Sequence, residues 1–268
     1  MIIHECDQGS EQWEALRAGK ITASRFDSIF TAAKCEISKS STKYIRELIA
    51  ACCCPEFKKW TGNRATDRGT EMEPIAREEF AKATGLSVKP VGFVTMEAGD
   101  NPYCSAIGCS PDGLIVDDAG EYIAGLEIKA PYPDTHVGYV LDAAAAREEL
   151  LKGRHLSEVT PALQQAALSL GLPDAYKQQV HGSLIVTGLP VWHFWSYFPG
   201  MQPLHCIVRP DDYTAKLKAA LLAFARTYAA ALESSRRHLV PNAEVSDGGP
   251  LTPESKQSAN PPFAAPTC

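Results

Sequence analysis

The sequence predicts an α/β fold, in which one mixed, twisted β-sheet is flanked by helices on both sides. Apolar residues at helical spacing dominate both ends of the chain, and short apolar segments bounded by Gly, Pro, Asp and Asn dominate the middle. A chain of 268 residues with 45% hydrophobic and 22% charged residues has the composition of an ordinary globular domain. We therefore expect one domain over residues 1–238 and a flexible Pro-, Gly- and Ser-rich tail over 239–268.

The N-terminal part is predicted to be helical. Residues 10–30 indicate a short helix, a break at Gly19 and a second helix that Thr22 or Ser24 can cap. In the segment 41–54, apolar residues recur at intervals of three and four, which is typical of an amphipathic helix. We therefore expect three helices here and a fourth after a loop, all before the first strand-like segment.

That loop is basic and polar, and it contains Lys58, Lys59, Arg64 and Arg68. The helix after it is expected to run from about Met72 to Ala83. Pro74 should either kink this helix or lie in its first turn, because a proline inside a helix lacks the N–H that the helix needs.

The middle and the end of the chain alternate between strands and helices. Six segments are predicted to be strands, several of them paired antiparallel: 86–95, 103–107, 114–116, 122–128, 191–197 and 205–208. A long helical stretch spans 135–186 and is interrupted near Gly153, Pro161 and Pro173, and an Ala- and Leu-rich helix spans 215–237.

Composition excludes several classes of protein. No apolar run approaches the roughly 20 residues of a membrane helix, and the N-terminus is not a secretory signal, so we expect a cytoplasmic protein. Such a compartment keeps thiols reduced, and we interpret Cys52, Cys53 and Cys54 as small buried hydrophobic residues at a helix end. The formal net charge of −6 argues only weakly against a nucleic-acid ligand, because an acidic protein can carry a local basic groove.

The clearest chemical pattern is Asp112, in SPDG, followed by GLEIK at 125–129. If GLEIK is a strand, Glu127 and Lys129 point to the same face and Ile128 points into the core. Asp112 at the entry to a preceding hairpin strand would then bring two carboxylates and a lysine together. Carboxylate-bound Mg²⁺ and a lysine are what phosphodiester hydrolysis needs, although a hairpin with a surface salt bridge explains the same residues.

Five motifs in fixed order favour a site for phosphodiester hydrolysis over a surface salt bridge. They are LRAGKITAS (16–24), GTEME (69–73), CSPDGL (109–114), GLEIKAP (125–131) and YKQQV (176–180). Together they resemble the lambda-exonuclease, or YqaJ-like viral recombinase, family of PD-(D/E)XK nucleases. The resemblance implies a restriction-endonuclease-like core and an Mg²⁺-dependent deoxyribonuclease, with Mn²⁺ as a substitute metal.

The resemblance also implies roles for single residues around the metal. Asp112, Glu127 and the backbone carbonyl of Ile128 would bind Mg²⁺, Glu73 would stand in the shell of a second metal, and Lys129 would serve the attacking water. Considered alone, Glu73 fits an ordinary solvated carboxylate on a helix.

Further roles concern the substrate. Gln179 would orient water or phosphate near the metals, and Arg17, Ser24 and Ser110 would form a pocket for a terminal 5′-phosphate. Considered alone, Gln179 fits a surface amide, and Arg17 and Ser24 fit a surface charge and a helix cap.

The implied activity is 5′-to-3′ digestion of one strand of linear double-stranded DNA, which leaves a 3′ single strand for phage-type recombination. A ring-shaped homotrimer and a single-strand annealing protein as partner are implied as well. The alternatives are an endonuclease or RecB-type nuclease module, and a non-catalytic DNA-end-binding protein with the same fold. The chain departs from the family in a longer segment between 133 and 176, in His181 after the YKQQV motif, and in its tail.

Overall fold

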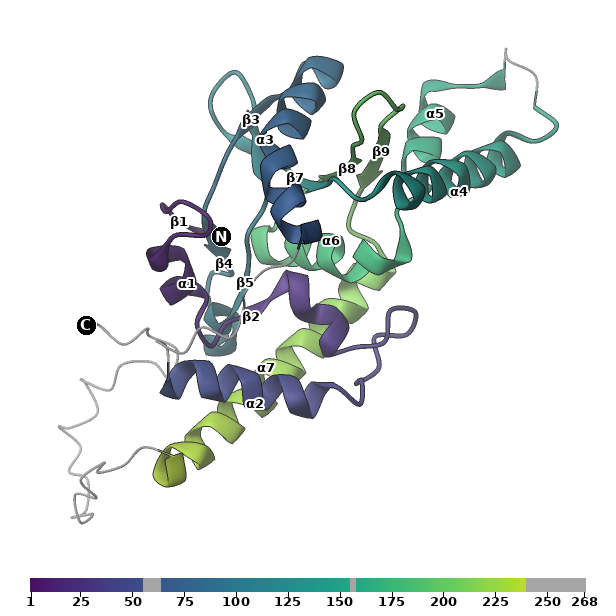
Figure 1. Cartoon of the computed structure of the whole chain (residues 1–268). Coiled ribbons are helices and arrows are strands. Elements are labelled where there is room, and N and C mark those ends of the chain that lie inside the picture. The colour runs from purple at the N-terminus through teal and green to yellow at the C-terminus, as the bar shows by residue number, and fades with distance from the viewer. Residues whose placement is uncertain (55–63, 155–157, 240–268) are drawn as a thin grey trace.

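The computed structural model describes residues 1–54, 64–154 and 158–239, and Figure 1 shows the path of the chain. The strands form two mixed sheets. The first has the order β1-β4-β5-β2, from Ile2–His4 (β1), Phe93–Thr95 (β4), Ile107–Cys109 (β5) and Ile21–Thr22 (β2). The second has the order β3-β6-β7-β8-β9, from Ser87–Lys89 (β3), Gly113–Val116 (β6), Tyr122–Lys129 (β7), Trp192–Ser196 (β8) and Leu204–Val208 (β9). The predicted α/β class is confirmed, with the strands divided between two sheets.

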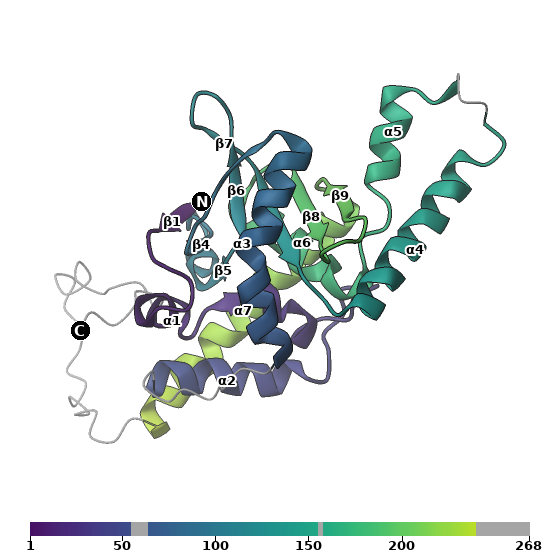
Figure 2. The same cartoon turned by 45° about the horizontal axis from the view of Figure 1, so that its top comes forward.

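Helices surround these sheets. The α-helices are Glu11–Arg17 (α1), Ser41–Cys53 (α2), Arg64–Thr84 (α3), Pro133–Leu151 (α4), Pro161–Leu168 (α5), Asp174–Thr187 (α6) and Asp212–Leu239 (α7). Two 3-10 helices are Ala23–Ser28 (η1) and Pro102–Ala106 (η2). Figure 2 shows α4 and α5 extending away from the body of the protein. None of the described helices is long and apolar enough to cross a membrane.

Strand β7 carries the GLEIK motif and is central in the second sheet. It pairs antiparallel with β6 and parallel with β8. Leu126 and Ile128 are buried against Ala76 and Phe80 of α3. Because side chains alternate along a strand, the intervening Glu127 points to the opposite face, which α6 covers.

Gly125 of the same motif is required by packing. It lies opposite Trp192 of β8, and a Cβ on Gly125 would come within 2.2 Å of the indole ring. Trp192 is fully buried with Val180 and Leu184 of α6. The glycine therefore lets α6 and its tryptophan pack closely beside the strand that carries Glu127.

The chain passes from one sheet to the other between β5 and β6, and Ser110 and Asp112 lie at this crossing. The first sheet packs against its own hydrophobic core, to which α2 and α7 contribute residues such as Leu48, Leu221 and Phe224. The Asp112 N–H donates to the Leu126 carbonyl at 3.1 Å. The crossing is thereby tied to β7, as the predicted hairpin requires.

Three predictions in the N-terminal half are wrong in part. The second helix within 10–30 is only the six-residue η1, which follows the short strand β2. The segment 86–95 is two strands in different sheets, because the sequence Pro90-Val91-Gly92 separates β3 from β4. The segment 103–107 is mainly η2, where Pro102 stands in the first turn and the Asn101 side chain accepts the Tyr103 N–H.

Helix α3 begins earlier than predicted. Arg64 and Arg68 belong to the helix and not to a loop, whereas Lys58 and Lys59 lie outside the described residues. Of the predicted tail, Leu239 is the last residue of α7, and 240–268 lie outside the described residues. Pro74 lies inside α3 and not in its first turn. Burial of the helix against the second sheet outweighs the cost of an internal proline here.

The three consecutive cysteines are not the buried residues that the sequence suggested. Cys52 and Cys54 are exposed and Cys53 is half-buried. They stand at the end of α2, beyond the turns that bury Tyr44 and Leu48. The helical position was therefore predicted correctly, but the helix passes the edge of its core before it ends.

Candidate active site

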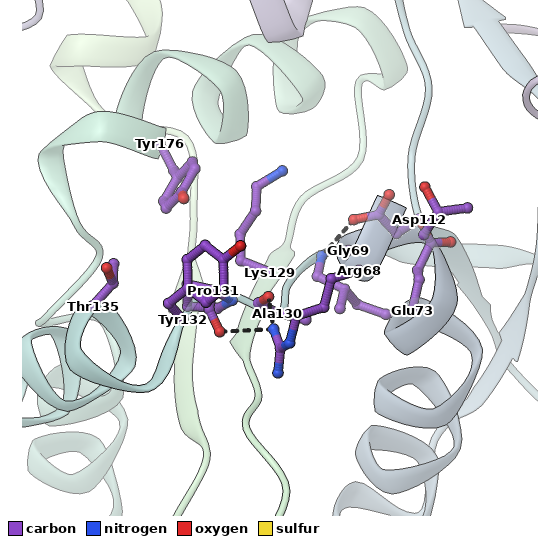
Figure 3. A pocket seen from close by; sticks show the side chains of 12 residues that line it. Arg68, Gly69, Glu73, Asp112, Lys129, Ala130, Pro131, Tyr132, Thr135 and Tyr176 are labelled. Atoms are coloured by element: carbon purple, nitrogen blue, oxygen red, sulfur yellow. Dashed lines mark hydrogen bonds between the residues drawn. The ribbon is translucent and has the colours of Figure 1, made fainter. Parts of the chain in front are cut away.

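A pocket of about 470 Å³ lies between α3, the end of β7, the segment that follows β7, and α6 (Figure 3). Its lining includes Asp112, Lys129 and Glu73, together with Ile128. These side chains come from a helix, a strand and the crossing between the two sheets. Residues more than 50 positions apart in the sequence therefore meet at one place, as the motifs suggested.

Glu127 is the most deeply buried acidic residue in the described part of the chain, with 1% of its surface exposed. Its Oε1 atom accepts hydrogen bonds from Lys129 Nζ at 2.5 Å and from Gln179 Nε2 at 2.6 Å. Its Oε2 atom is buried and has no hydrogen-bond partner. Burial raises the pKa of Glu127 to about 7, against the lowering effect of Lys129. A buried carboxylate oxygen without a hydrogen-bond partner costs folding free energy, and a bound cation next to it would offset that cost.

Asp112 is held from several sides. Its Oδ2 atom accepts the Ile128 N–H at 2.5 Å, and its backbone carbonyl accepts Arg77 Nε at 2.8 Å. Burial raises the pKa of Asp112, while Lys129, the Ile128 N–H and Arg77 lower it. The carboxyl group is therefore fixed next to the end of β7.

Glu73 faces this pair from α3. Its carboxylate forms an ion pair with Arg77, one helical turn further on. Burial and the neighbouring Asp112 raise the pKa of Glu73 to about 7. Asp112 thus raises the pKa of both Glu73 and Glu127, and Glu73 raises that of Glu127, which is typical of carboxylates that share a cation.

Lys129 remains a cation in these surroundings. Burial alone would lower the pKa of Lys129, but the Glu127 and Asp112 carboxylates outweigh burial and raise it. Its ammonium group also lies 5.2 Å from the centre of the Tyr176 ring. The two carboxylates therefore favour the protonated, ammonium form of Lys129.

The donor set fits Mg²⁺. In the described part of the chain, no three His, Cys, Asp or Glu side chains form a group ready to hold a metal. Mg²⁺ does not need such a cage, since it is usually held by one or two carboxylates and keeps several waters. Asp112, which lines the pocket, and the unpaired oxygen of Glu127 would provide those carboxylates.

Arg17 contacts Ser110, which lies two residues before Asp112 of the pocket lining. Arg17 Nη1 donates to Ser110 Oγ at 3.0 Å, and the Trp13 indole N–H donates to the same oxygen at 3.0 Å. The Arg17 guanidinium lies 4.1 Å from the Trp13 ring centre. Burial lowers the pKa of Arg17, and within the described residues no ion pair joins this guanidinium to a carboxylate. A cation held in this way suits an anionic ligand.

The third residue of the predicted phosphate pocket stands apart. Ser24 is exposed and is the second residue of η1, not the first residue of an α-helix. No hydrogen bond among the described residues joins it to Arg17 or Ser110. His181, which departs from the family motif, is buried and contacts Thr214 of α7 with its ring nitrogen at 2.8 Å.

Sequence reasoning missed part of the site. Arg68 and Tyr132 line the pocket, and Arg68 contacts residues 62 and 63 positions further along the chain. Only the fold brings these positions together, so no local spacing signals the contact. Arg77 did have a signal, because it lies four residues after Glu73 on a helix.

Comparison with known proteins agrees with this geometry. The model of the YqaJ-like viral recombinase domain matches residues 12–190. The alkaline exonuclease LHK-Exo from Laribacter hongkongensis superimposes with a TM-score of 0.60 at 28% identity, covering 85% of this chain and 97% of that one. The same exonuclease in complex with dAMP gives a TM-score of 0.61 at 27% identity, with the same coverage.

A phage-related exonuclease from Haemophilus somnus 129PT shares the fold, with a TM-score of 0.54 at 13% identity over 81% of this chain and 96% of that one. The comparison with curated proteins gives no match. The core is the restriction-endonuclease-like fold that the motifs implied. Since the family model covers more than half of the sequence, the chain belongs to the YqaJ-like viral recombinase family.

Proposed function

We propose that this protein is an Mg²⁺-dependent 5′-to-3′ exonuclease that digests one strand of linear double-stranded DNA and leaves a 3′ single strand. The observation that carries the proposal is the buried Glu127 carboxylate, which has one unpaired oxygen and whose charge interacts with Lys129 and Asp112. Membership of the family and the likeness to exonucleases support the reaction class.

Asp112 and Glu127, with the backbone carbonyl of Ile128, would hold the metal, and Glu73 would serve a second metal. When bound, Mg²⁺ supplies an activated water and neutralises the charge that builds on the phosphate. Glu127 is fixed for this purpose by Gln179, whose amide N–H donates to Oε1. Gln179 therefore positions a carboxylate as well as any water or phosphate nearby.

Lys129 acts through its charge. Glu127 and Asp112 raise the pKa of Lys129 and so favour its ammonium form. It is thus suited to orient the attacking water and to stabilise the extra negative charge on the phosphate in the transition state. A positioned cation of this kind adds to catalysis only while the protein holds it close to the reacting atoms.

The proposed polarity rests on Arg17 and Ser110. Ser110 lies two residues before Asp112, so an anion bound by Arg17 and Ser110 would lie close to the proposed metal site. A terminal 5′-phosphate held there would present the first phosphodiester to the metal. Ser24 is exposed, so it would contact the DNA only if the bound strand passes over it.

The biological setting is proposed from the family. The 3′ single strand would pass to a single-strand annealing protein during phage-type recombination in the cytoplasm of a bacterial host. A ring-shaped homotrimer would keep the enzyme on its DNA. Mn²⁺ would replace Mg²⁺, since both accept carboxylate and water ligands.

The test compares three substrates in Mg²⁺: a linear duplex with 5′-labelled ends, the same duplex labelled at the 3′ ends, and a closed circle. The proposal expects early release of the 5′ label, late release of the 3′ label and an intact circle. Nicking of the circle would favour an endonuclease. Retention of all label with tight end binding would favour a DNA-end-binding protein.

A further inference from the structure

An arginine flanked by two aromatic rings lies at the edge of the candidate active site. Arg68 Nη1 donates to the carbonyl oxygens of Ala130 at 2.5 Å and Pro131 at 2.9 Å. The same guanidinium lies 5.0 Å from the ring centre of Phe198 and 6.0 Å from that of Tyr132. Arg68 therefore fixes the segment after β7 and supports both rings through cation–π attraction.

Tyr132 is the outermost member of this group. It is 47% exposed, although it lines the pocket and follows Lys129 by only three residues. Figure 3 shows Tyr132 beside Arg68, on the Lys129 side of the pocket. An aromatic ring of this size usually buries its surface, so one that is braced and still open to the pocket has a face available for a ligand.

The charges of the pocket indicate which part of a DNA strand would use that face. Glu73, Asp112 and Glu127 repel phosphates until a cation neutralises them. The bases are neutral, and every base has a π face that an aromatic side chain can stack on, whatever the sequence. An exonuclease must also accept any sequence, which stacking allows and hydrogen bonding to base edges does not.

We propose that Tyr132 is a stacking platform for the base of one of the two nucleotides that flank the scissile phosphate. This inference rests on the proposed function, because it needs a DNA strand in the pocket. The ring holds an unstacked nucleotide in register with Lys129, and Arg68 keeps the ring in place. Tyr132 is thus a binding residue that acts on substrate position and not on the chemical step.

The test uses linear duplexes with a single abasic nucleotide at the first, second or third position from the 5′ end of the digested strand. Initial cleavage is measured at low DNA concentration in Mg²⁺. With the parent protein, an abasic nucleotide at one of these positions should slow cleavage by about 10-fold, the size expected for one lost stacking contact. Tyr132→Ala should lose a similar factor on intact DNA and nothing further on that abasic substrate.

Tyr132→Phe keeps the ring and should recover most of the rate that Tyr132→Ala loses. Leu141→Ala is the matched control, because Leu141 is an exposed apolar residue of α4 outside the pocket and should behave as the parent does. If Tyr132→Ala cleaves abasic DNA more slowly than the parent does, so that the two rate losses add, the inference is overturned. A Tyr132→Ala rate equal to the parent rate would overturn it as well.

A binding measurement separates this inference from the proposed function. A 2-aminopurine placed at the sensitive position reports stacking by its fluorescence, and EDTA prevents metal-dependent cleavage. The fluorescence on binding should differ between the parent and Tyr132→Ala and agree between the parent and Leu141→Ala. If all three proteins give the same signal, the stacking role of Tyr132 is wrong, but the proposed nuclease function is unaffected. If the parent digests no linear duplex in Mg²⁺, the proposed function fails first.

Discussion

Arg17→Ala should remove most of the preference for ends that carry a 5′-phosphate. Arg17 is buried, donates to Ser110 Oγ and has no carboxylate partner among the described residues, so its charge is available to an anion. A hydrogen bond to a charged group contributes about 1.5–3 kcal/mol. With two donors of the guanidinium on the phosphate, the loss is about 3 kcal/mol or more, which is roughly a 100-fold change in rate.

The assay measures initial digestion of two linear duplexes that differ only in a 5′-phosphate or a 5′-hydroxyl, at matched ionic strength. The ratio of the two rates is compared between proteins, so any difference in the folded fraction cancels. The parent should prefer the phosphate, and Arg17→Ala should bring the ratio close to one while a slow activity remains. Arg17→Lys should be intermediate, because lysine keeps the charge without the planar fork.

Arg25→Ala is the matched control, since Arg25 is a nearby exposed arginine that pairs with Glu47. Its ratio should equal that of the parent. An unchanged ratio in Arg17→Ala would refute the assignment of this pocket to a 5′-phosphate.

Other predictions concern catalysis and stability. Lys129→Ala should slow hydrolysis by about 100-fold or more with DNA binding retained in a gel-shift assay, and an unchanged rate would remove the lysine from the mechanism. Burial lowers the pKa values of His193 and His205, whose ring nitrogens are 2.8 Å apart, to about 4. Because the unfolded chain binds protons first, their contribution is complete above about pH 6.5. It is lost as the pH falls from there towards 4, by on the order of 3 kcal/mol for each histidine. Urea unfolding should show this fall, reduced in His205→Gln, and an equal fall in both proteins would contradict it. Gly125→Ala should destabilise the protein by about 1–3 kcal/mol, because its Cβ would strike a buried ring. Gly138→Ala, in a helix with open space around the new Cβ, should instead raise the melting temperature slightly, so equal shifts in the two variants would count against the packing argument.

The convergence of Glu127 and Lys129 could be predicted from the sequence because it depends on local geometry. Alternation along one strand places both side chains on the same face, and the observed ion pair follows from it. Asp112 could be added because a short hairpin joins it to that strand. The family motifs then supplied Glu73 and Gln179, whose distances in sequence carry no geometric information.

Other features depend on contacts that no local pattern contains. The strand-like segment 86–95 divides between two sheets, which is decided by pairing with β1 and β6 far away in sequence. Ser24 was expected at a helix start, but the chain forms only a 3-10 helix after a short strand. Arg68 reaches Ala130 and Pro131 because α3 packs across the sheet, and its position near the pocket was therefore not foreseen.

The central claim is that Asp112 and Glu127 hold a metal ion that the enzyme needs to hydrolyse DNA from its 5′ end. It is tested most directly by the release of labelled 5′ nucleotides from a linear duplex as Mg²⁺ is titrated from EDTA upwards. The account predicts a saturable dependence on Mg²⁺ in the parent and no release at any Mg²⁺ concentration in Asp112→Asn or Glu127→Gln, with all three proteins folded by circular dichroism. Release in EDTA, or variants that match the parent curve, would contradict it.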